Sequence, residues 1–83
     1  MRRSDQDFEL RLNSLEIEWR LAYEASRAAG ADFLALSARP DVRFAEVQEA
    51  RRRLDEAEEQ KAQILAKIER FETLVTRRLR VNE

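Results

Sequence analysis

The chain has 83 residues, enough for one small domain, and 40% of them are charged although the formal net charge is only −1. This balance gives no overall attraction to nucleic acid or to an anionic membrane. Histidine and cysteine are both absent. The usual zinc ligand sets, Ser-His and Cys-His nucleophile pairs and the Glu-x-x-His motif of di-iron bundles therefore cannot be built. We expect a protein that is not an enzyme and has no catalytic, cofactor-binding or metal-binding residues.

The sequence also lacks the signals of membrane insertion and export. No apolar run approaches the roughly 20 residues of a membrane span, and no signal-peptide core follows Met1, Arg2 and Arg3. The absence of cysteine suits a reducing compartment. These features predict a cytoplasmic chain that does not associate with a membrane.

Two long helices are predicted, over about residues 4–38 and 42–80, with a turn at about 39–41. The chain contains one Gly and one Pro and is otherwise rich in strong helix formers. Pro40 disfavours helix at Arg39, and Asp41 is suited to cap the helix that follows. Ser4 and Asp7 are arranged like a capping box at the first helix N-terminus. The whole chain, residues 1–83, is thus predicted to be one all-α domain.

Gly30 leaves an alternative open for the first helix. A glycine inside a helix costs about 1 kcal/mol relative to alanine, and glycine is also the usual residue just after a helix end. The first helix therefore either ends at Ala29, with a short helix after it, or continues through Gly30. We favour the continuous helix because its apolar pattern runs through Ala29 and Phe33 without a change of phase.

Each predicted helix carries one apolar stripe in which spacings of three and four residues alternate, the heptad pattern of a coiled-coil seam. In the first helix the seam consists of Phe8, Leu12, Leu15, Trp19, Ala22, Ser26, Ala29, Phe33 and Leu36. In the second helix it consists of Val47, Ala50, Leu54, Ala57, Lys61, Ile64, Ile68, Phe71 and Val75. This pattern predicts an antiparallel two-helix hairpin that packs like a coiled coil.

Folding the chain at Pro40 keeps the two seams in register along their whole length. The predicted pairs include Phe8 with Phe71, Trp19 with Lys61, Ser26 with Leu54 and Phe33 with Val47. Lys61 stands where the heptad calls for an apolar residue. We expect its stem to lie along the Trp19 indole, with a cation–π contribution of about 0.5–1 kcal/mol, and its charge to help fix the register.

The first helix has a second apolar stripe about 160–180° from its seam at 100° per residue. We call it the outer stripe; it consists of Leu10, Ile17, Leu21, Ala28 and Ala35. An isolated helix pair of this size buries little surface. We therefore predict a homodimer that forms through the first helices and makes an antiparallel four-helix bundle. The alternatives are that the outer stripe docks a different protein, or that its residues are exposed singly.

Trp19 and Tyr23 are four residues apart and lie on one side of the first helix. Packing in the seam and at its edge is the main interpretation. As an alternative, the pair anchors a partner, because Trp and Tyr are favoured in interfaces. We include both with Leu10, Ile17 and Leu21 as candidate interface residues.

Two arginine clusters are candidates for contact with nucleic acid or another anion. Arg51, Arg52 and Arg53 point about 100° apart and wrap around the helix among carboxylates, which favours a solvated surface. A second cluster is expected at the open end of the hairpin, where both chain ends meet. This predicted basic tip consists of Arg2, Arg3, Arg77, Arg78 and Arg80.

These features predict a non-enzymatic helical module for protein–protein interaction, such as an adaptor, a small chaperone or an assembly factor. Its expected partners are a second copy of itself and another protein. The alternative is a small nucleic-acid-associated regulator that uses the basic tip.

Overall fold

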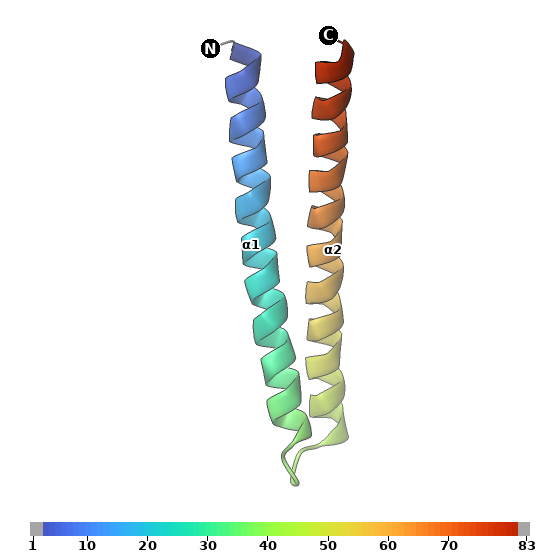
Figure 1. The fold of residues 1–83 in the computed structure, drawn as a ribbon. Helices are drawn as coiled ribbons and strands as arrows, with labels where there is room; N and C mark the ends of the chain where they lie inside the picture. The colour runs from blue at the N-terminus through green and yellow to red at the C-terminus, as the bar shows by residue number, and fades with distance from the viewer. Residues whose placement is uncertain (1–2, 82–83) are drawn as a thin grey trace.

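The computed structural model describes residues 3–81 and forms two long helices, α1 (Arg3–Ser37) and α2 (Phe44–Val81). The helices run antiparallel and pack side by side, so both ends of the chain lie at one end of the rod and the turn at the other (Figure 1). The rod measures 63 × 19 × 14 Å. The predicted all-helical hairpin is confirmed.

Every seam residue is buried or half-buried. Leu15, Ala22, Ala50 and Phe71 are at most 9% exposed, and the Ser26 residue is 4% exposed. The remaining seam residues of both helices have intermediate exposure. None of the side chains that the structure describes is fully buried. The hairpin core is therefore a single layer between two helices, with solvent on both flanks.

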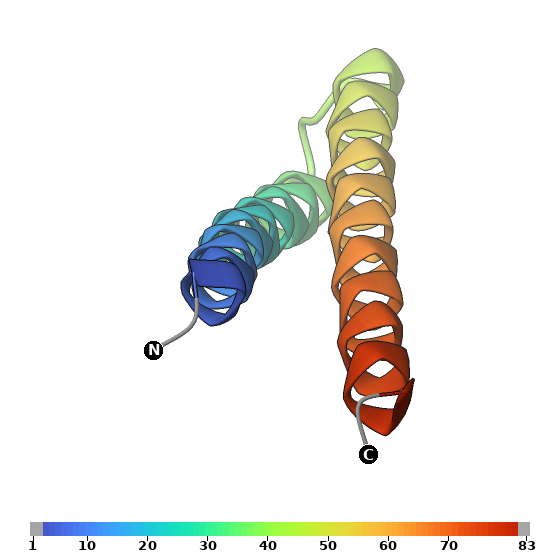
Figure 2. The same ribbon diagram turned by 90° about the horizontal axis from the view of Figure 1, so that it is seen from above.

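The helices approach more closely near the turn than at the chain ends (Figure 1), and their axes are inclined to each other (Figure 2). The seam residues explain this shape. Small residues such as Ala22, Ala29 and Ala50 lie toward the turn, whereas Phe8 and Phe71 lie toward the ends. Because the separation of packed helices depends on the side chains between them, large residues hold the open end apart.

Gly30 lies inside α1, which continues without a break to Ser37. None of the described residues has a positive φ, so Gly30 does not serve as a helix cap. A Cβ atom at this position would lie 3.7 Å from Leu54 Cδ1, an ordinary van der Waals distance. An alanine would therefore fit here beside Leu54, and the continuous helix is confirmed.

The turn is longer than the predicted 39–41, because α1 ends at Ser37 and α2 begins at Phe44. The last turn of α1 is closed by bonds from the Ala38 amide to the Leu34 carbonyl and from Arg39 to Leu36. The Arg43 carbonyl accepts the first bonds of α2. Asp41 does not lie at the start of α2; its carboxylate is 3.5 Å from Arg39 Nε.

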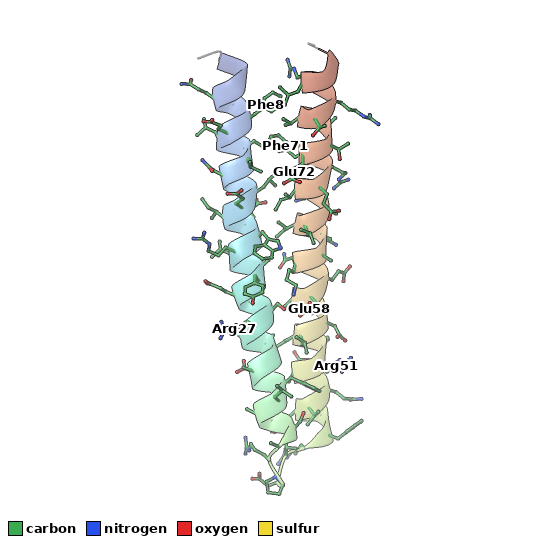
Figure 3. All side chains as sticks on the ribbon, viewed as in Figure 1. Phe8, Arg27, Arg51, Glu58, Phe71 and Glu72 are labelled. Atoms are coloured by element: carbon green, nitrogen blue, oxygen red, sulfur yellow. The ribbon has the colours of Figure 1, made fainter. Side chains whose placement is uncertain are left out.

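Three contacts across the hairpin involve residues other than the predicted partners. The predicted partners were Leu54 for Ser26, Val47 for Phe33 and Trp19 for Lys61. In the structure each of these three residues contacts one four positions later: Ser26 contacts Glu58, Phe33 contacts Arg51, and Lys61 contacts Tyr23. The pair at the open end, Phe8 and Phe71, meets as predicted, with ring centroids 5.7 Å apart (Figure 3).

Two physical effects account for this difference. The turn is centred slightly later than Pro40, which moves α2 along the rod. In addition, each Cα–Cβ bond leans toward the N-terminus of its own helix. Side chains of α1 therefore lean toward the open end of the hairpin, and side chains of α2 lean toward the turn. As a result, a side chain of one helix contacts a residue of the other helix that lies later in the chain than the residue directly opposite its own Cα atom. Large rings such as Phe8 and Phe71 can still bridge an offset near one 5.4 Å turn.

Candidate association surface

The outer stripe of α1 is exposed in the hairpin. The large side chains Leu10, Ile17 and Leu21 are 67%, 59% and 63% exposed, and Ala28 and Ala35 are exposed as well. The stripe thus lies on the side of α1 away from α2. Full burial of a Leu or Ile side chain contributes about 1.5–3 kcal/mol. The hairpin leaves most of that free energy available for association.

The remaining exposed apolar residues do not form a comparable stripe. Leu34 lies on α1 outside the outer stripe, and Phe44 lies at the start of α2. Leu65 and Leu79 share one heptad position of α2, whereas Leu74 lies on the opposite flank. Their spacing does not repeat along a face, so only the structure reveals their exposure.

A groove of about 880 Å³ lies between the helices near the turn. Its floor is formed by small side chains of α1 and α2, including Ala28, Ala29, Ala35, Ala45 and Ala50. Acidic and basic residues line its margins, namely Asp32, Arg39, Glu46, Glu49 and Arg53. The groove therefore continues the outer stripe at its alanine end and offers an apolar floor with charges of both signs.

Trp19 and Tyr23 stack on each other, with ring centroids 5.3 Å apart and ring planes 22° apart. Trp19 is half-buried in the seam, and its Nε1 atom is buried without a hydrogen-bond partner. Tyr23 is 43% exposed and faces Lys61 of α2. The structure thus places these two residues at the contact between the helices, separate from Leu10, Ile17 and Leu21.

Lys61 lies over the ring of Tyr23, with Nζ 5.7 Å from the ring centroid, in place of the predicted contact with the indole. Nζ also forms a 3.0 Å ion pair with Glu58, whose carboxylate accepts a hydrogen bond from the buried Ser26 hydroxyl at 2.5 Å. The Ser26 hydrogen bond, and after it Lys61, lowers the pKa of Glu58 below its usual value. Ser26, Glu58, Lys61 and Tyr23 therefore form a polar link between the two helices.

We expect Lys61→Leu to keep the hairpin and to melt at the same temperature as the native chain or a higher one. The substitution removes a cation–π contact of about 0.5–1 kcal/mol but buries apolar surface at a half-buried seam position. Thermal unfolding followed by circular dichroism measures this. Lys61→Glu is the matched control and should melt lower, because its carboxylate would face Glu58. A large loss of helix in Lys61→Leu would show that Lys61 is needed for the fold itself and would contradict a role limited to fixing the register.

The arginines at 51–53 are paired with carboxylates of their own helix. Arg51 lies 3.2 Å from Asp55, and Arg52 bonds Glu49 at 2.6 Å and also Glu56. Arg53 lies 3.4 Å from Glu49. The hydrogen bond from Arg52 is the main cause that lowers the pKa of Glu49, and Glu49 in turn raises the pKa of Arg52. This arrangement matches a solvated helix surface.

The predicted basic tip is described only in part. Arg77 and Arg78 are exposed near the end of α2, and the Arg78 guanidinium lies over the Phe8 ring at 5.2 Å. Arg2 lies outside the described residues, and the same holds for the side chains of Arg3 and Arg80. In the described part of the tip, Arg78 thus stacks on an aromatic ring and Arg77 is exposed to solvent.

Two further findings concern the described residues, 3–81. Their acidic side chains form no group of three that is arranged to hold a metal ion. Neither helix has a stretch apolar and long enough to traverse a bilayer. Comparison of the chain with protein-family models, with curated proteins and with solved structures finds no match.

Proposed function

We propose that this protein is a non-enzymatic helical interaction module that forms a homodimer through the outer stripe of α1. The observation that carries the proposal is the run of large aliphatic side chains on one helix face, Leu10, Ile17 and Leu21, each about three-fifths or more exposed. Contiguous exposed apolar surface of this kind marks interaction sites in water-soluble proteins.

The thin core of the hairpin supports the same proposal. None of the side chains that the structure describes is fully buried, and no disulfide can add stability because cysteine is absent. Small chains with so little buried surface commonly gain stability by oligomerisation. Two hairpins joined through α1 would give a four-helix bundle with a second apolar layer between the copies.

In this proposal the dimer acts in the cytoplasm as an adaptor, small chaperone or assembly factor, and presents its remaining surface to another protein. The exposed side chains of α2, such as Leu65 and Leu79, stay free for that partner when α1 is occupied. Affinity capture from the native host with mass spectrometry identifies the partner. A Leu65→Glu/Leu79→Glu bait run in parallel separates specific partners from background.

Light scattering on the purified chain tests the homodimer directly. The expected mass is twice the 9.8 kDa of the chain, falling toward the monomer only on dilution. A monomer at every concentration, with the hairpin folded by circular dichroism, would refute self-association.

The second candidate is a nucleic-acid-associated regulator that uses the basic tip. Its support is the exposed Arg77 close to Arg78 at the end where both termini lie (Figure 1). Binding through phosphate contacts would be strongest at low salt and would weaken steeply as salt rises. Retention on DNA or RNA that disappears on neutralising the tip arginines would favour this function, and no retention at low salt would exclude it.

A further inference from the structure

The side chains of the outer stripe differ in size from one end of α1 to the other. Its large residues, Leu10, Ile17 and Leu21, lie between the N-terminus and the middle of α1, and its small residues, Ala28 and Ala35, lie in the C-terminal half. Ser14, Glu24 and Ala31 fill the gaps, so the full stripe alternates spacings of four and three residues. It therefore has the period of a second coiled-coil seam.

This asymmetry distinguishes the two ways in which copies of α1 can pair. Parallel pairing sets Leu10 against Leu10 and Ala28 against Ala28, so the helices would be forced apart at one end. Antiparallel pairing sets Leu10 across from Ala35, Ile17 across from Ala28 and Leu21 across from Glu24. Each of these three layers then joins a large residue to a smaller or polar one, so no two large residues face each other and the axes keep a more even spacing.

The groove near the turn provides a place for the large residues. Ala28 and Ala35 line it on α1, and Ala45 and Ala50 line it on α2. In the antiparallel pairing, Leu10 and Ile17 of a second copy lie at the level of this groove. The groove of one copy thus receives Leu10 and Ile17 of the other copy. The two-fold symmetry repeats this contact at the other end of α1.

The charges beside the stripe fit the same arrangement. Arg11, next to Leu10, would lie near Asp32 of the second copy, on the same side of the stripe. Within the hairpin neither side chain has an ion-pair partner among the described residues. Opposite charges therefore meet twice in this pairing, because the two-fold symmetry repeats the Arg11–Asp32 contact.

We propose that the second copy docks antiparallel, α1 against α1, with the two-fold axis between Ala22 and Tyr23, so that Leu10 and Ile17 of each copy enter the alanine-lined groove of the other. This inference rests on the proposed function, because it specifies the geometry of the same homodimer. It goes further in naming the orientation, the register and the groove as the receiving site.

Cysteine cross-linking tests the orientation cleanly because the chain has no cysteine of its own. Two single variants are prepared, Ile17→Cys and Ala28→Cys. Under mild oxidation, neither should cross-link with itself, while their equimolar mixture should give a disulfide-linked dimer. The two copies of residue 17 would be offset by 11 residues, about 16 Å, and a disulfide requires Cα atoms within about 7 Å. A mixture of Ile17→Cys with Leu79→Cys is the matched control and should not cross-link.

Light scattering of the native chain and of each variant separates failure of this inference from failure of the homodimer itself. A monomeric native chain would overturn both. A dimer in which Ile17→Cys cross-links with itself would overturn the antiparallel pairing alone. A dimer that gives no disulfide in any mixture would overturn the register.

Charge reversal provides a second test that leaves the stripe intact, in case a cysteine weakens the dimer. Arg11→Asp and Asp32→Arg should each raise the dimer Kd by about 2- to 30-fold, since two exposed ion pairs are lost per dimer. The double variant Arg11→Asp/Asp32→Arg should restore the native Kd. Additive weakening in the double variant would refute the contact between these residues.

Discussion

The double variant Ile17→Glu/Leu21→Glu is expected to be a folded monomer. Both positions are more than half exposed in the hairpin, so a carboxylate there costs little when the chain is alone. In the dimer the same substitutions bury four carboxylates against a second α1. Removing each from water costs several kcal/mol without a paired cation. The dimer Kd should therefore rise by at least about 1000-fold.

Light scattering and circular dichroism together measure this result. The variant should have half the native mass while it keeps its helical signal. Leu65→Glu/Leu79→Glu adds the same charges to exposed positions of α2 and should remain a dimer. If the α1 variant stays a dimer of unchanged stability, the association face lies elsewhere on the molecule.

Phe71→Ala is expected to have the largest effect on folding, a loss of about 3–5 kcal/mol, the usual cost of deleting a buried ring. Phe71 is 9% exposed, and its ring lies 5.7 Å from that of Phe8 at an angle of 56°. Its removal opens the seam where bulky residues hold the helix ends. Small domains are stable by only about 5–15 kcal/mol, so the variant should be largely unfolded near physiological temperature.

Urea unfolding at a fixed chain concentration measures this loss, since the stability of a dimer depends on concentration. Phe71→Leu is the matched control and should cost less than about 1.5 kcal/mol, because it keeps most of the volume. A loss in Phe71→Ala no larger than that in the Leu control, less than about 1.5 kcal/mol, would show that the packing of this ring contributes little.

The seam and the helices could be predicted from the sequence because each depends on local spacing. A residue's position on a helix face follows from its number and the 3.6-residue period. Every predicted seam residue, including the polar Ser26 and Lys61, is accordingly buried or half-buried. The continuity of α1 through Gly30 followed from the same period, since a helix break would have shifted the phase at Phe33.

The exposure of Leu10, Ile17 and Leu21 was also predictable, because these residues lie opposite the seam. The pairing of Lys61 was not. It depends on the length of the turn and on the opposite lean of side chains in antiparallel helices, and these effects together move contacts by about one turn. The Lys61 charge therefore lies over Tyr23, which stacks on Trp19.

The sequence by itself determined which residues face the partner helix and which face away, because a helical period converts spacing directly into direction. The tertiary structure alone decided what meets across the hairpin: the Ser26–Glu58 bond, the Lys61–Tyr23 contact and the alanine-lined groove near the turn. These features depend on the relative height and separation of two helices. Both are set by the turn from Ala38 to Arg43 and by the sizes of facing side chains, which no spacing within a single helix encodes.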